Sequence, residues 1–148
     1  MSKKRSEKPL TLEDELSSLK SKYQGRLAPP LEGLAYRFML WIPVQAKGKP
    51  VFTPEQLWHL FDMFHHCFGG CSHSRLEGFP PWTGSWLPKG ADEPIVDHHI
   101  QIIAYALQDK ESVECMRELK RMLQQEHIAA QEVVLIEQIP FVEAAPVL

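Results

Sequence analysis

The residues best suited to chemistry are acids, imidazoles and cations in two apolar stretches. Asp97 and His99 lie two positions apart in an alternating stretch. On a β-strand this spacing puts both side chains on one face, about 7 Å apart, close enough to share a proton, a water or a ligand. Tyr105 shares their face, and Arg37, from an earlier stretch, can hold an anionic group. These four residues are the candidate catalytic residues.

A second cluster places three histidines and two cysteines within residues 65–73, and imidazole nitrogen and thiolate sulfur are ligands that zinc prefers. The spacing does not suit zinc. His65 and His66 point about 100 degrees apart on a helix, and Cys67 and Cys71 do not form the tight Cys-x-x-Cys turn. We therefore predict no metal and no cofactor. The alternative is a metal site made of His73, Cys71 and His99.

Aromatic side chains gather between residues 71 and 94, a segment rich in proline and glycine. A connection of this length is usually functional or contains a short strand, and Thr83 to Leu87 is the best candidate for that strand. Trp82 and Trp86 can line a pocket, grip a partner or fold onto the domain edge, since aromatic residues concentrate at binding hot spots. The candidate binding residues are Trp82, Trp86 and Gln101.

Apolar periodicity predicts the elements that position these side chains. The run from Leu34 to Pro43 predicts a buried strand, and Thr53 to Gly69 predicts a helix with an N-cap threonine, a first-turn proline and a glycine stop. Residues alternate from Ile95 to Leu107, which indicates a strand with an aliphatic and a polar face. An amphipathic helix follows over 110–127, and a last strand over 131–139 is stopped by the proline behind it.

The order of these elements is strand, helix, strand, strand, helix, strand. Two such split units make a four-stranded antiparallel sheet with both helices on one face, so the predicted class is α+β with the ferredoxin-like βαββαβ fold. Phe68-Gly69-Gly70, Gly84-Ser85-Trp86, an acidic residue at the head of the third strand and Gln131-Glu132-Val133 resemble patterns in small uncharacterised proteins of this fold. This resemblance covers roughly residues 34–140, and it implies a fold but no reaction.

The chain divides into an arm, a domain and a tail. Residues 1–32 form a polar N-terminal arm, in which Thr11 to about Tyr23 has the pattern of a short helix. Residues 33–141 form the ferredoxin-like domain, and residues 142–148 are expected to fray. A chain of 148 residues that is 44% hydrophobic suits one domain with one core.

Charge and composition exclude several classes of partner. The chain has 16 Lys and Arg against 19 Asp and Glu, and residues 1–26 are net basic, which leaves the folded part acidic. Nucleic-acid binding is disfavoured, because it normally needs a basic patch on the folded part. No apolar run reaches the roughly 20 residues that cross a bilayer. The N-terminus lacks the apolar region of a secretory signal, so we expect a cytoplasmic protein with reduced cysteines.

The sheet face that the predicted helices leave uncovered is the expected site. It carries Asp97, His99, Gln101 and Tyr105 together with either Arg37, Met39 and Trp41 or their alternates. The uncovered face of such a sheet often packs against a second copy. We therefore expect a homodimeric binding or interaction module. The alternative is a small, metal-assisted enzyme with its site on the same face.

Overall fold

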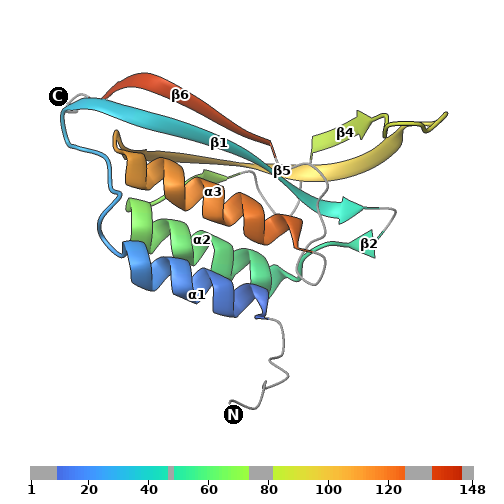
Figure 1. The fold of residues 1–148 in the computed structure, drawn as a ribbon, viewed down its shortest axis with the longest axis horizontal. Helices are drawn as coiled ribbons and strands as arrows, with labels where there is room; N and C mark the ends of the chain where they lie inside the picture. The colour runs from blue at the N-terminus through green and yellow to red at the C-terminus, as the bar shows by residue number, and fades with distance from the viewer. Residues whose placement is uncertain (1–9, 47–48, 74–81, 126–134, 145–148) are drawn as a thin grey trace, which may run out of the picture.

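The structure of the protein, a computed structural model, describes residues 10–46, 49–73, 82–125 and 135–144. In chain order its elements are α1 (Leu12–Tyr23), β1 (Gly33–Ala46), β2 (Lys49–Pro50), α2 (Pro54–Phe68), β3 (Ser72–His73), β4 (Trp82–Trp86), β5 (Ile95–Leu107), α3 (Lys110–Gln124) and β6 (Leu135–Ala144). Figure 1 shows the helices on one face of the sheet. The chain is therefore α+β, and its described part has one helix more than the two predicted for the domain.

β1 and β5 form the centre of the antiparallel sheet. They pair from Ala35 opposite Leu107 to Ala46 opposite Asp97. β6 pairs with the other edge of β1 and β4 with the other edge of β5, so the four longer strands lie in the order β6-β1-β5-β4. The two-residue strands β2 and β3 pair with β1 and β5. The bounds of β5 agree with the prediction from the sequence.

One face of the sheet packs against the helices and carries the core. In the middle of β1 and in β5 from Ile100 onward, the even-numbered residues point into it and are at most 1% exposed: Phe38, Leu40, Ile42, Ile100, Ile102, Ala104 and Ala106. Because strand side chains alternate, the odd-numbered residues point away from the helices. The predicted aliphatic face of β5 is confirmed from Ile100 onward, whereas Val96, near the start of the strand, is exposed.

α2 follows the signals in its sequence. The Thr53 hydroxyl accepts a hydrogen bond from the Gln56 N–H (3.1 Å), and the Gln56 side chain accepts one from the Thr53 N–H (2.9 Å). This capping box, with Pro54 in the first turn, fixes the start of the helix. Gly69 ends it with a left-handed φ of 87°. The predicted apolar stripe is buried: Leu57, Leu60, Phe61, Phe64 and Phe68.

α1 is part of the core and not an appendage to it. The helix begins as predicted, with the Thr11 hydroxyl accepting a hydrogen bond from the Asp14 N–H at 3.2 Å. Four of its side chains are buried in the common core: Leu12, Leu16, Leu19 and Tyr23. After the helix, the Leu27 N–H donates to the carbonyl of Cys67 in α2. The part of the predicted arm that forms α1 is therefore packed into the domain.

β6 extends beyond its predicted end. The sequence predicted a strand over 131–139 stopped by Pro140, but β6 continues to Ala144. Proline is tolerated there because β6 pairs only with β1 among the described strands, and the register shifts beside Pro140. Residues 142–144 consequently belong to the sheet and not to a frayed tail.

Some predicted segments reach beyond the described residues. Residues 131–134 of the last strand and 126–127 of the last helix lie outside them, and α3 ends at Gln124. The strand predicted over 83–87 corresponds to β4. Within the described ranges, none of the helices combines the length and the apolar character needed to cross a membrane.

Candidate functional site

The open face is the side of the sheet that the three helices leave uncovered (Figure 1). Its described side chains come from odd-numbered positions of β1, β5 and β6, with Ser72 from β3. Ala35 and Pro43 of this set are buried. The exposed or half-buried members are Arg37, Met39, Trp41, Ser72, His99, Gln101, Ile103, Tyr105, Leu107, Glu137 and Ile139. The sequence left open whether the odd-numbered or the even-numbered residues of the first strand lie here. The burial of Phe38 and Leu40 on the other face decides it.

The strand register arranges these side chains in rows. One row holds Ile139, Arg37 and Tyr105, and the next holds Glu137, Met39 and Ile103. Directly opposite residues have Cα atoms within about 5.5 Å of each other, so neighbouring rows form one continuous surface. Tyr105, Leu107 and Ile139 are 43%, 36% and 39% exposed, whereas Arg37 is half-buried.

Arg37 and Glu137 carry the charges of this surface. The Nε atom of Arg37 is buried and has no hydrogen-bond partner among the described residues. Glu137 is exposed, and neither residue takes part in the ion pairs that the described residues form. Arg37 is therefore able to bind an anionic group, and that role stays a prediction.

Trp41 and His99 are in contact across the two central strands. Their ring centroids lie 4.9 Å apart at an interplanar angle of 69°, which is an edge-to-face contact. The imidazole thus lies on the open face, where the alternation of β5 predicts it. Asp97 belongs to the same strand, but its side chain lies outside the described residues. The pairing of Asp97 with His99 therefore stays a prediction.

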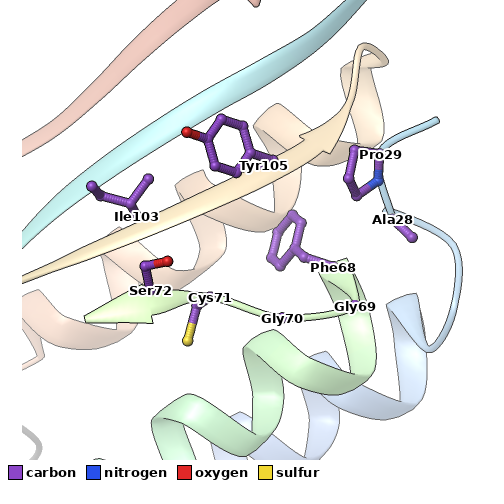
Figure 2. Close-up of a pocket in the computed structure, with 9 residues that line it drawn as sticks. All are labelled: Ala28, Pro29, Phe68, Gly69, Gly70, Cys71, Ser72, Ile103 and Tyr105. Carbon is purple, nitrogen blue, oxygen red and sulfur yellow. The ribbon is translucent and has the colours of Figure 1, made fainter. Parts of the chain in front are cut away.

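A groove of about 330 Å³ opens at the edge of the open face, beside β3 (Figure 2). Its lining consists of Ala28, Pro29, Phe68, Gly69, Gly70, Cys71, Ser72, Ile103 and Tyr105. Ile103 and Tyr105 also belong to the open face, so the groove and the face are continuous. The lining has no Asp, Glu, Lys, Arg or His, and its polar side chains are two hydroxyls and a thiol. Such a groove suits an uncharged group.

Known proteins do not identify this surface. Comparisons with protein-family models, with curated proteins and with solved structures find no match. Function must therefore be inferred from the open face and its groove.

Phe68 and Gly69, at the end of α2, line the groove. Three carbonyls of the last turn of α2 are already bound, because those of His65, His66 and Cys67 accept hydrogen bonds from the N–H groups of Gly69, Gly25 and Leu27 respectively. Burial raises the pKa of the Cys71 thiol to about 11. The thiol is consequently protonated at neutral pH, which makes it a poor nucleophile and a poor metal ligand.

The residues of the alternative metal site lie on two sides of the sheet. His73 is opposite Ile102, whose side chain faces the helices, and its ring stacks on Phe61 with centroids 3.9 Å apart. His99 points to the open face instead. The fold therefore does not bring His73, Cys71 and His99 together. Among the described residues, no group of three or more His, Cys, Asp or Glu is placed to hold a metal ion.

The other two cysteines belong to the core. All three cysteines are free thiols, and Cys67 and Cys115 are almost completely buried. The Cys67 Sγ lies 3.6 Å from the carbonyl oxygen of Leu19. A hydrogen bond to Cys67, together with burial, raises the pKa of Cys115. These two thiols act as small apolar groups in packing.

The candidate binding residues lie on two neighbouring strands. Gln101 is on the open face, directly opposite Trp41. Trp82 and Trp86 are the first and last residues of β4, which pairs with β5. The side chains of both tryptophans lie outside the described residues, so their roles stay predictions.

Sequence reasoning missed Glu137 and Ile139 as members of the open face. The apolar run from Val133 to Ile136 reads as a strand buried on both faces, which conceals the alternation that follows it. It also missed Ala28 and Pro29 in the groove, because they are brought there by the hydrogen bonds that tie the chain after α1 to α2. No local signal in the sequence marks those contacts.

Proposed function

We propose that the protein is an interaction module that forms a homodimer through its open face. The row of Ile139, Arg37 and Tyr105 carries this proposal. Two large side chains, each more than a third exposed, flank a half-buried arginine whose Nε lacks a partner among the described residues. Covering such a surface is favourable, because removal of apolar area from water contributes roughly 25 cal/mol per Å².

The residue types of the open face support an interface between proteins. Trp, Tyr and Arg are the residues most enriched at binding hot spots, and the face has Trp41, Tyr105 and Arg37 within three rows. Interfaces are also enriched in methionine and depleted in lysine. Met39 lies near the middle of the face, and its described side chains include no lysine.

A second copy of the chain suits the face better than a nucleic acid does. Its described side chains include one arginine and one glutamate, so with neutral histidines the face has no net charge. Binding to a phosphate backbone needs several positive contacts. A sheet with one uncovered, largely apolar face is instead a common surface for self-association.

The strand order also supports a finer description of the fold. The order β6-β1-β5-β4, with α2 and α3 on one face, supports a ferredoxin-like arrangement. In this description α1, β2 and β3 are additions to a βαββαβ unit. The three helices then occupy one face, and the open face is left for a partner.

The enzymatic alternative has less support. It needs Asp97 and His99 to act together, and the side chain of Asp97 lies outside the described residues. No carboxylate, imidazole or amine lines the groove beside Tyr105. General acid–base catalysis most often uses one of these groups, and the remaining candidates in the lining are the phenol of Tyr105 and the thiol of Cys71, whose pKa burial raises to about 11.

Size-exclusion chromatography with multi-angle light scattering tests the proposal. The full chain has a mass of 17.0 kDa, and we expect twice that mass over a wide range of protein concentration. A mass that stays at the value of one chain at the highest concentration would overturn the proposed dimer.

A further inference from the structure

The two charged side chains of the open face lie on neighbouring strands, one row apart. Arg37 of β1 is opposite Ile139, and Glu137 of β6 is opposite Met39. Among the described side chains of this face, they are the only ones that come from Arg, Lys, Asp or Glu. The face thus has one positive and one negative group, separated along a diagonal.

Neither charge is neutralised by another described residue. The two side chains form no ion pair, and the buried Nε of Arg37 has no acceptor within the described ranges. On the helical side of the molecule, basic side chains do pair with acids. Arg26 lies 2.6 Å from Glu111, and Lys20 lies 3.1 Å from Asp62. Because Arg37 is half-buried and unpaired with an acid among the described residues, its guanidinium gains from a carboxylate supplied by another chain.

We propose that, in the homodimer, Arg37 of each protomer binds Glu137 of the partner subunit. The inference rests on the proposed function, because it requires the open faces of two copies to meet. A two-fold axis between the two sheets, perpendicular to the diagonal from Arg37 to Glu137, places each charge of one copy over the opposite charge of the other. The dimer therefore contains two identical ion pairs, one at each end of the diagonal.

The chemistry of the two groups suits this contact. The two terminal nitrogens of a guanidinium can donate two parallel hydrogen bonds to one carboxylate. Only the Nε of Arg37 is buried, and the residue as a whole is half-buried, so the terminal end of its side chain is the part that a carboxylate of the partner can reach. Glu137 is exposed on the edge strand β6 and is accessible to a second chain.

The pairing determines how the two sheets are aligned more than how tightly they bind. Removing two charges from water offsets much of their attraction, whereas a misaligned dimer leaves them unpaired or opposes like charges. Apolar side chains in the same rows, Met39, Ile103 and Ile139, provide the area to be buried. Because the pair runs diagonally, the strands of the two sheets cross and do not run parallel.

Charge reversal tests the pairing, because a second reversal can undo it. Arg37→Glu and Glu137→Arg each oppose like charges, so each should raise the dimer dissociation constant at least about tenfold in sedimentation equilibrium. Mixing the two single variants should restore the affinity, since their heterodimer pairs opposite charges at both contacts. Arg117→Glu makes the same charge change on the exposed side of α3 and should leave the dimer unchanged.

Uncharged variants keep the test decisive where a reversed charge disturbs folding. Arg37→Gln and Glu137→Gln should each weaken the dimer. The double variant should be weakened by clearly less than the product of the two single effects, because both substitutions remove the same contact. Circular dichroism and thermal unfolding show whether each variant is folded.

The outcomes separate this pairing from the proposed function. A monomeric wild-type protein overturns the dimer and the pairing with it. A wild-type dimer that neither reversal weakens overturns the pairing alone. Rescue in the Arg37→Glu/Glu137→Arg double variant without rescue on mixing also overturns it, because the ion pair would then lie within one chain.

Discussion

Arg37 and Tyr105 lie directly opposite each other on the two central strands of the sheet. This row belongs to the open face and also borders the groove, the two features that bear on function. Tyr105 lines the groove and is also on the open face, and Arg37 is the only Arg or Lys among the side chains described there. Substitutions at these two positions therefore test the surface most directly.

Truncation of Tyr105 should weaken the dimer without unfolding the chain. Tyr105→Ala removes an exposed aromatic ring from the centre of the proposed interface, so we expect a loss of about 2 kcal/mol in dimerisation, or roughly thirtyfold in dissociation constant. Sedimentation velocity measures the change. Leu31→Ala is the control, because Leu31 is 92% exposed and lies outside the sheet. Equal effects of the two variants would argue against the open face as the interface.

The Cys71 thiol should react slowly. Its pKa of about 11, against an ordinary 9.0, reduces the thiolate fraction at pH 8 by about a hundredfold. Reaction with a disulfide reagent should therefore speed up until the pH approaches 11, while Cys67 and Cys115 react only on unfolding. Reaction of Cys71 at pH 8 as fast as that of a free thiol would contradict its burial.

The same shift affects stability at high pH. Because burial raises the pKa of Cys71 in the folded chain, its contribution to the free energy of unfolding is complete below about pH 9 and is lost as the pH rises toward 11. Cys71→Ser should flatten this part of the profile in urea unfolding at a series of pH values. If the free energy of unfolding fell equally with pH in the wild type and in Cys71→Ser, the fall would be due to groups other than Cys71.

Packing of α1 into the core is tested by two neighbouring substitutions. Leu16 is 2% exposed, so Leu16→Ala should lower the free energy of unfolding by about 2 to 5 kcal/mol. Ser17 is exposed, and Ser17→Ala should change the free energy by less than about 0.5 kcal/mol. Urea unfolding followed by circular dichroism measures both. If Leu16→Ala left the free energy of unfolding unchanged, the helix would not belong to the cooperative core.

The turn after α2 offers a matched pair of glycines. Gly69 has a φ of 87°, so Gly69→Ala forces a left-handed conformation on alanine and should cost about 1 to 2 kcal/mol. A Cβ at Gly69 would lie 3.7 Å from the Cβ of Ala28, an ordinary contact, so the cost is one of backbone conformation. Gly70→Ala meets open space and should change the free energy of unfolding little. Thermal unfolding of both variants gives the comparison, and equal stabilities would refute the strain at Gly69.

Local signals predicted the central elements well. The Thr53 and Gln56 capping box set the start of α2, and strict alternation gave β5 its bounds, because both signals depend on residues a few positions apart. Burial of Ile100 and Ile102 then placed His99 on the open face. These parts of the fold and site need no knowledge of distant contacts.

Tertiary contacts explain where the structure differs from the predictions made from the sequence. α1 has few apolar residues, and its burial depends on α2, which the residues of the arm do not reveal. Pro140 normally ends a strand, but an edge strand with a shifted register accepts it. The open-face position of Glu137 depends on the pairing of β6 with β1, which no local pattern encodes.

Isotope-filtered nuclear Overhauser spectroscopy on a half-labelled sample tests the open-face dimer most directly. One half of the protein carries ¹³C and the other does not, so only contacts between chains are detected. We predict such contacts from the ring of Tyr105 and the methyl groups of Leu107 and Ile139. Contacts confined to the helical side, for example from the exposed Trp58 of α2, would contradict the account, as would the absence of any contact between chains.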